Sequence, residues 1–245
     1  MASDDGVQAG LTAAVVAVGG GAAADRLCAC CVQLLAVDGA ALSLTSGGTD
    51  YSVGVSGTGI KTITELQFTL GEGPCFDVVS SSAPVLVADL NDTHRWPAFA
   101  GAAAELGVRA VFALPITVAG FPVGVLTLCR HRPGRLTGSA VTGVFLAAEL
   151  AVLPLLDVMG TDMRAALNDV GSPAWAELGS MMRSEVYQAT GVLIAQLGVP
   201  PAEAMVRLRA HAFATGLSIS DIAYQILDHH LYLDDDDKDR PGSER

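Results

Sequence analysis

The chain has 245 residues, 51% of them hydrophobic, and a formal net charge of -12 at pH 7. That length suffices for one large domain or for a medium sensor domain with a small second module, and the apolar content excludes a disordered chain. The negative charge argues against unspecific binding to nucleic acid through a general basic field.

The N-terminal stretch lacks the features of a secretory signal, because Asp4 and Asp5 stand where a signal peptide carries positive charge. The apolar run from Leu11 to Ala24 is rich in Ala, Gly and Val and is shorter than the roughly 20 bulky apolar residues of a membrane span. We therefore expect a cytoplasmic protein without a membrane partner, in which residues 1–23 form an N-terminal helical segment.

Five cysteines give no disulfide framework, because their number is odd, and we expect them to be reduced. The cluster of Cys28, Cys30 and Cys31 is compatible with a metal or redox site. However, Ala22 to Val37 has helical periodicity, free cysteine often acts as a small buried apolar residue, and no CxxC or paired-histidine pattern is present. We favour structural cysteines and predict no bound metal.

Short β-branched stretches bounded by Gly, Ser, Asp or Pro predict strands. They are Gly39–Thr45, Tyr51–Gly57, Pro84–Val87, Ala110–Val118 and Phe121–Cys129. Ala119 and Gly120 supply a tight turn between the last two, which predicts an antiparallel hairpin. Helices are expected at Thr62–Thr69, Pro74–Ser80, Pro97–Leu106 and Ser139–Leu155. This order indicates an α+β domain, an antiparallel sheet with flanking helices.

Several motifs in this region belong together: GAALSL, Glu65 and Gln67 in TELQ, LGEGPCFD at Leu70–Asp77, the DL and RWPAF segments at Asp89–Phe99, GVRAVFALPI and FPVGVLTL. On these motifs, residues 24–156 resemble a GAF domain. The resemblance implies a sensor, and GAF domains bind cyclic nucleotides, haem, flavin, bilins or nothing. The fold therefore does not name a small molecule or the residues that bind it.

Cys75 in the LGEGPCFD motif stands at a predicted helix N-terminus, where a thiolate is favoured. The alternative, which we favour, is that Gly73 and Pro74 start a helix that packs Cys75 and Phe76 inward. Some GAF proteins reduce free methionine sulfoxide with pocket cysteines, so a thiol-dependent reductase that uses Cys75 is an alternative function. We expect no enzyme and no catalytic residue, because no nucleophile-and-base pair is recognisable, and His94 and Trp96 are interpreted as a solvated residue and a packing anchor.

Residues 157–172, which contain Gly160 and Gly171, are expected to interrupt helicity and link the sensor to a second module at residues 173–233. Apolar residues there recur at helical spacing in three runs, which begin at Val186, Ala204 and Ile222. Turn residues separate the runs: Gly198, Pro200 and Pro201, then Gly216, then Ser218 with Asp221 as an N-cap. Three short amphipathic helices follow.

Gly191 lies inside the first of these helices, where glycine costs about 1 kcal/mol relative to alanine. Ser184, Gln188 and Ala195 share its helix face and are small or polar. A close helix crossing and a binding surface both explain such a stripe, and the sequence leaves both open.

The spaced motifs YQATG, Glu203–Ala204, LRAHA at Leu208–Ala212, and Leu217, Asp221 and Ala223 resemble an ANTAR domain, the RNA-binding module of transcription antiterminators. Thr190 stands where many members have lysine, and YQATG resembles the form in actinobacterial members. A GAF sensor followed by ANTAR also resembles actinobacterial regulators that join the two.

The resemblance implies a signal-responsive antiterminator that holds paired hairpins of nascent mRNA so that a terminator does not form, and that affects RNA polymerase indirectly. The expected RNA contacts are Arg183 and Arg209 to phosphate or a purine edge and Gln188 to a loop base, with Thr190 and Gly191 permitting close approach. For Arg209 the alternative is an ion pair within the chain, with Glu203 or Asp221.

The helix at Ser139–Leu155 is apolar over more of its circumference than one sheet face requires. Either a homodimer or the N-terminal segment Gly10–Val18 explains the surplus, and we favour the homodimer because related RNA readers usually act as dimers. The tail at residues 234–245 starts with an acidic run and is expected to be disordered.

Two other function classes stay open. A DNA-binding transcription factor would use the third helix, Ser218–His230, as its recognition helix, but that helix has no lysine or arginine. A protein-interaction module without nucleic acid would agree with the net charge.

Overall fold

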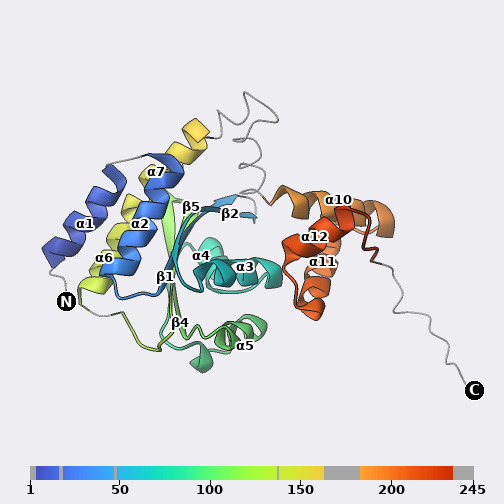
Figure 1. Cartoon of the computed structure of the whole chain (residues 1–245), viewed down its shortest axis with the longest axis horizontal. Helices are drawn as coiled ribbons and strands as arrows, with labels where there is room; N and C mark the ends of the chain where they lie inside the picture. Colours follow the sequence, from blue (N-terminus) through green and yellow to red (C-terminus); the bar gives the residue numbers. More distant parts are fainter. Residues whose placement is uncertain (1–3, 17–18, 47–48, 137, 163–182, 234–245) are drawn as a thin grey trace, which may run out of the picture. The chain divides into compact units, whose positions relative to one another are not determined.

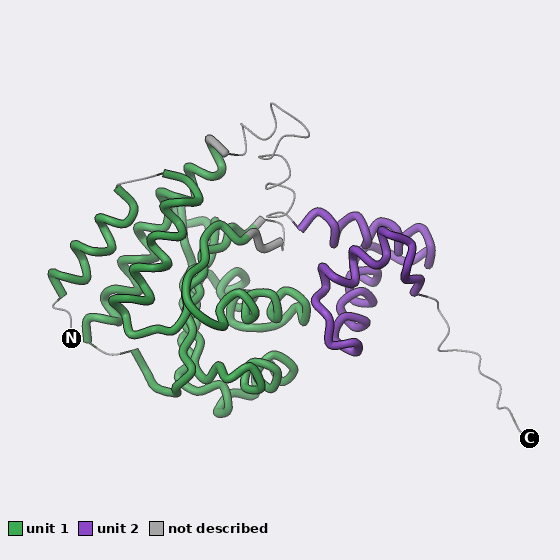
Figure 2. Tube along the Cα trace, viewed as in Figure 1, with its two compact units in different colours: residues 1–182 green, residues 183–245 purple. Residues whose placement is uncertain are grey.

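The computed structural model describes residues 4–16, 19–46, 49–136, 138–162 and 183–233. They divide into two compact units, residues 1–182 and 183–245, which Figure 2 shows in green and purple. The predicted tail and the predicted linker beyond residue 162 lie outside the described residues, as do residues 173–182 of the expected second module.

A five-stranded antiparallel sheet forms the centre of the first unit, in the order β2-β1-β5-β4-β3. The strands are β1 (Gly39–Ser46), β2 (Thr49–Gly57), β3 (Val85–Val87), β4 (Ala110–Val118) and β5 (Phe121–Arg130). All five predicted strands are present. The first and last strands of the predicted region, β1 and β5, pair in the middle of the sheet.

The turn between β4 and β5 is formed by Ala119 and Gly120, with φ angles of 51° and 85°. Two successive positive φ values are the pattern of the two-residue turns whose twist fits antiparallel strands. The predicted hairpin is confirmed.

Helices cover both faces of the sheet (Figure 1). One face carries α1 (Asp4–Val16), α2 (Gly20–Leu34), α6 (Ser139–Leu150) and α7 (Val152–Asp157); the other carries α3 (Ile60–Leu70), α4 (Pro74–Ser81) and α5 (Pro97–Glu105). Residues of β5 alternate between two apolar cores accordingly: Leu126 and Leu128 face α2 and α6, whereas Val125 and Cys129 face α3 and α5. The predicted α+β architecture is confirmed.

The first core takes up both the cysteine cluster and part of the surplus apolar surface of α6. Cys28 and Cys31 are fully buried, and burial raises the pKa of the Cys31 thiol to about 12, which fits a structural residue. From α1, Val7 and Leu11 join the same core as Val144, so the N-terminal segment covers one side of α6. Other apolar side chains of α6 and α7 remain exposed, among them Val141, Phe145 and Leu153.

The end of the first unit differs from the sequence prediction. The expected single helix has a break at Ala151, and a π-helical segment, Val158–Asp162, continues beyond α7. The prediction that Gly160 interrupts helicity is therefore wrong. The stretch Ser139–Gly160 is long and apolar enough to span a membrane, but 44% of its most apolar window is buried within the protein, as in the core helices of soluble domains.

The second unit has three helices, α10 (Ser184–Leu197), α11 (Pro201–Thr215) and α12 (Ile219–Leu227), with a 108° bend between the first two. Gly198 and Gly216 end their helices in the left-handed region, and the Ser218 hydroxyl accepts a hydrogen bond from the Asp221 N–H at 3.1 Å. The predicted boundaries and caps are confirmed, except that α12 ends at Leu227 and not at His230.

Candidate nucleic-acid interface and the sensor interior

The exposed face of α10 carries the small and polar stripe expected from the sequence. Val186, Ala189 and Leu193 are buried in the three-helix core, whereas Gln188 and Gly191 are exposed. A Cβ atom at Gly191 would meet no heavy atom within 4 Å, so a close helix crossing within the described residues does not explain this glycine. The binding-surface interpretation is the one that remains.

Thr190 does not lie on that exposed face. Its side chain is 6% exposed, and its hydroxyl donates a 2.7 Å hydrogen bond to the Val186 carbonyl one turn earlier. This back-bond uses the hydroxyl inside the helix. The structure therefore corrects the expectation for Thr190, which offers no hydroxyl group at the surface.

Arg209 lies half-buried on α11 and interacts electrostatically with Tyr187 of α10. Partial burial lowers the pKa of Arg209, and the interaction with Tyr187 opposes this shift. Glu203, one of the partners considered for Arg209, forms an ion pair with Arg207 at 2.7 Å. Asp221, the other, accepts a 2.8 Å hydrogen bond from the Ser218 hydroxyl.

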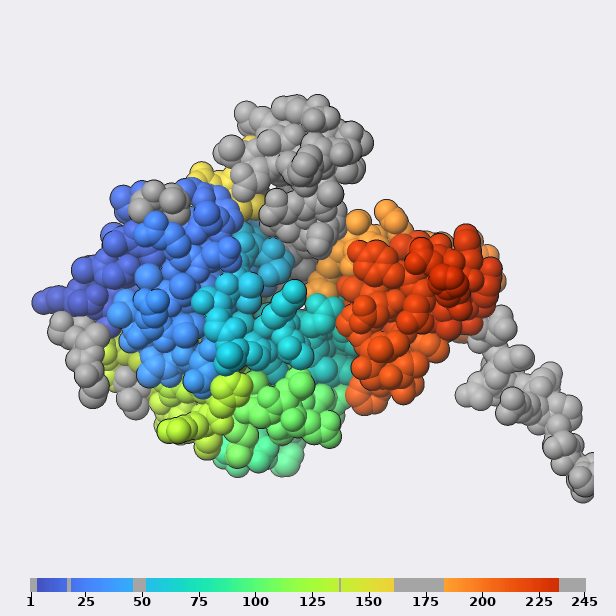
Figure 3. Space-filling model, viewed as in Figure 1, coloured from blue at the N-terminus to red at the C-terminus, as the bar shows by residue number. Residues whose placement is uncertain are grey.

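Arg183 is the N-cap residue of α10 and adopts a left-handed φ of 49°. The structure therefore places Arg183, Gln188 and Gly191 along the first two turns of one helix, and the electrostatic interaction with Tyr187 places Arg209 beside that helix. Figure 3 shows side chains of all three helices at the surface of the second unit, in orange to red.

A buried hydrogen bond holds α10 against α12. The Glu185 side chain is 8% exposed and accepts a 2.8 Å bond from the Ser220 hydroxyl. This bond satisfies one oxygen of a carboxylate that would otherwise be costly to bury. It also takes a negative charge away from the exposed face of α10.

The exposed face of α12 is acidic. Asp221 and Asp228 are exposed on either side of Tyr224, and the helix contains no lysine or arginine. Readout of the DNA major groove relies most often on arginine or lysine. This surface is unsuited to the recognition helix of a DNA-binding protein.

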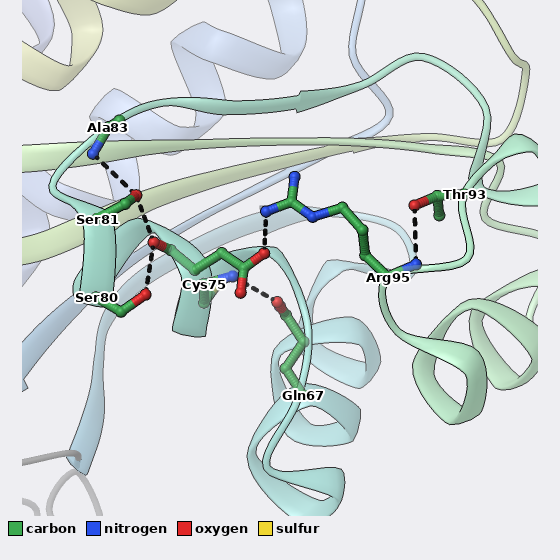
Figure 4. Close-up of polar contacts among 8 residues, drawn as sticks. Gln67, Cys75, Ser80, Ser81, Ala83, Thr93 and Arg95 are labelled. Atoms are coloured by element: carbon green, nitrogen blue, oxygen red, sulfur yellow. Dashed lines mark hydrogen bonds and ion pairs between the residues drawn. The ribbon is translucent and has the colours of Figure 1, made fainter.

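Inside the first unit, Gln67 of α3 organises the LGEGPCFD segment (Figure 4). Gln67 is 1% exposed, and its Oε1 accepts the Cys75 N–H at 2.8 Å. Its Nε2 is also buried and has no hydrogen-bond partner among the described residues. A Cβ atom at Gly73 would lie 2.6 Å from the Gln67 side chain, so glycine is required there.

Cys75 points inward, as the favoured interpretation of this motif predicted. It is 4% exposed, and its Sγ lies 3.0 Å from the Thr127 Oγ1 of β5. Cys129, two residues further along β5, is also buried, and burial, assisted by Asp38, raises the pKa of its thiol to about 12. Cys129 is therefore a neutral thiol near pH 7 and a poor partner in thiol redox chemistry.

The RWPAF segment is anchored to the same motif. Glu72 accepts the Phe99 N–H at 2.8 Å, and Arg95 forms an ion pair with Asp77. Trp96 is 3% exposed and packs edge-on against Phe99, which confirms it as a packing anchor. His94 is exposed, in agreement with a solvated role. These contacts explain both motifs by folding, without a catalytic group.

Family models agree with this division of the chain. A model described as GAF domain matches residues 22–153, more than half of the sequence. The chain belongs to the GAF domain family. A second model, described as ANTAR domain, matches residues 182–227. A GAF sensor followed by an ANTAR domain is the composition of an RNA-binding antitermination regulator.

Solved structures show the same fold for the first unit. The chain is similar to the GAF domain of a phosphoenolpyruvate-protein phosphotransferase from Coxiella burnetii (19% identity, TM-score 0.52, covering 66% of this chain and 96% of that one). It is also similar to the GAF domain of the Acinetobacter phosphotransferase (12% identity, TM-score 0.51, covering 64% and 94%). The free methionine-R-sulfoxide reductase from Neisseria meningitidis has 13% identity and a TM-score of 0.49, covering 62% and 90%. No curated protein matches the sequence.

Sequence reasoning missed Tyr187. Its ring is 40% exposed on α10, immediately before Gln188 and one turn before Gly191. The helical period contained the signal, because position 187 falls outside the core positions 186, 189 and 193. An aromatic residue off the core face of a short helix is a candidate for contact with a partner.

Proposed function

We propose that the chain binds paired hairpins of nascent mRNA through the exposed face of α10 and the adjoining part of α11, and so prevents a terminator from forming. The observation that carries this proposal is Gly191. It occupies a mid-helix position at a cost of about 1 kcal/mol relative to alanine, yet nothing in the described fold needs the space that it leaves.

The charge of the second unit favours loops over regular duplexes. Residues 183–233 contain Arg183, Arg207 and Arg209 as their arginines and no lysine, and Arg207 is paired with Glu203. Loop bases can be splayed out and read by side chains, whereas the grooves of an RNA duplex present little sequence to a protein. A module with few cations is therefore better suited to hairpin loops.

The remaining parts of the proposal concern the signal and the assembly. The unsatisfied Nε2 of Gln67 supports a small molecule with a hydrogen-bond acceptor as the signal in the GAF domain. Two hairpins call for two ANTAR domains, and the exposed Val141, Phe145 and Leu153 support a homodimer of this cytoplasmic regulator. RNA polymerase would respond indirectly, by reading through the absent terminator.

The test is a filter-binding comparison with the full chain, using a paired-hairpin RNA, a single hairpin and a duplex DNA of equal length. We expect retention of the paired-hairpin RNA at the lowest protein concentration and little retention of DNA. Equal binding of DNA and RNA would contradict the proposal, as would the absence of any RNA binding.

A further inference from the structure

Tyr187 stands between two arginines on the surface of the second unit. Arg183 precedes it by one turn at the N-cap of α10, and Arg209 of α11 interacts with it electrostatically. The other residues one turn away on its own helix, Ser184, Thr190 and Gly191, carry no charge. Its acidic neighbour in sequence, Glu185, is turned inward to Ser220.

Tyr224 is an instructive contrast on α12. It is 54% exposed, more than Tyr187 at 40%, but Asp221 lies three residues before it and Asp228 four residues after it, both exposed. A phosphate chain would be repelled there. Exposure alone therefore does not distinguish the two tyrosines, whereas the surrounding charge does.

The small number of cations limits what phosphate contacts can contribute. With at most three arginines in the described part of the second unit, the logarithm of RNA affinity should fall with the logarithm of salt concentration with a slope of about 2 per domain at most. Stacking of a base on an aromatic ring is worth roughly 1–3 kcal/mol and does not depend on counterion release.

Gly191 leaves room beside this tyrosine. Residues four apart on a helix are neighbours, so a side chain at position 191 would stand one turn along from Tyr187 on the same face. No side chain is there, and the position of its Cβ is open space. A base and its ribose can therefore approach the helix backbone next to the ring.

We propose that Tyr187 is the platform on which one unpaired base of an RNA hairpin loop stacks, with Arg183 and Arg209 contacting the flanking phosphates. This inference rests on the proposed RNA-binding function and adds to it the mode of contact. The ligand class is a single-stranded loop nucleotide, held by its base face and its backbone and not by a duplex groove.

The experiment uses the full chain and a paired-hairpin RNA that carries 2-aminopurine at one loop position at a time. We expect wild type to quench the fluorescence at one position. Tyr187→Phe should retain quenching, and Tyr187→Leu should abolish it and weaken binding about tenfold or more. Tyr224→Leu, the matched control, should leave both unchanged.

Photo-crosslinking of wild-type protein to RNA with 5-iodouracil in the loop gives a second readout that needs no variant, with mass spectrometry locating the adduct. An adduct at Tyr187 supports the inference. If wild type binds the RNA but Tyr187→Leu binds equally well, or if the adduct lies on α12, the stacking inference is overturned and the proposed function stands. If wild type binds no hairpin RNA, the proposed function fails first.

Discussion

Gly73 in the sensor and Gly191 in the ANTAR domain are both part of motifs that identify their domains, but the fold explains only the first. Gly73 has a φ of 134°, and a Cβ there would collide with Gln67, which itself holds the backbone of Cys75. Gly191 has no heavy atom within 4 Å of its Cβ position. When packing does not account for a costly residue, an external partner is the better explanation, and this separates the folding residues from the binding residues of the chain.

The largest expected effect sharpens the sensor side of this comparison. Gly73→Ala combines a strained φ with a collision against Gln67, and should lower the free energy of unfolding of the first unit by about 3 kcal/mol. Urea unfolding of the full chain measures it. Gly120→Ala is the control, because φ there is 85° but the space is open, and should cost about 1 kcal/mol. Equal losses would show that the collision is relieved.

Arg209→Ala tests the ANTAR side. We expect RNA affinity to fall roughly 10- to 100-fold, since a charge-assisted contact is lost, with nearly unchanged thermal stability. Arg207→Ala on the same helix is the control, and a smaller loss is expected because Arg207 already pairs with Glu203. Equal loss of stability and affinity in Arg209→Ala would show a folding role for Arg209.

Gly191→Ala should separate stability from function. Alanine in this open helical position should stabilise the second unit by about 1 kcal/mol. The added methyl group should weaken binding of hairpin RNA, because it occupies space that the nucleotide needs. Thermal melting and RNA titration measure the two effects. A variant that is more stable and binds RNA as well as wild type would remove Gly191 from the interface.

The smallest effect concerns the pH dependence of the sensor. The Asn91 N–H, together with Arg109, lowers the pKa of Asp89. Its stabilisation is therefore complete above the ordinary aspartate pKa of about 3.9 and is lost as pH falls through the lower folded value. Asp89→Asn should lower the urea midpoint slightly at neutral pH and not in strong acid. A difference that persists in strong acid would assign it to another cause.

The sequence predicted most of the local structure because turn residues and periodicity are local signals. The five strands end within two residues of their predicted positions, and Gly198, Gly216 and Ser218 bound the C-terminal helices as expected. Long-range facts were not available in the same way. The cover of α6 by α1 is one example, because nothing in either helix names its partner.

Among the site residues, helix geometry contained more than was used. Glu203 and Arg207 are four residues apart and share a face, whereas Glu203 and Arg209 are six apart and do not, so the pair with Arg207 follows from the period. The inward turn of Thr190 is different. A threonine hydroxyl can bond the carbonyl one turn back or face a partner, and only the packing around α10 decides between them.

The pairing of β1 with β5 also sets the order in which the molecule can fold. Gly39 lies opposite Cys129, so the centre of the sheet closes a very long loop, a contact pattern that slows folding. The three C-terminal helices touch only near neighbours in sequence and should form quickly. On the ribosome, the sensor has to wait until β5 has emerged, and the RNA-binding unit, although made last, can then fold with little delay.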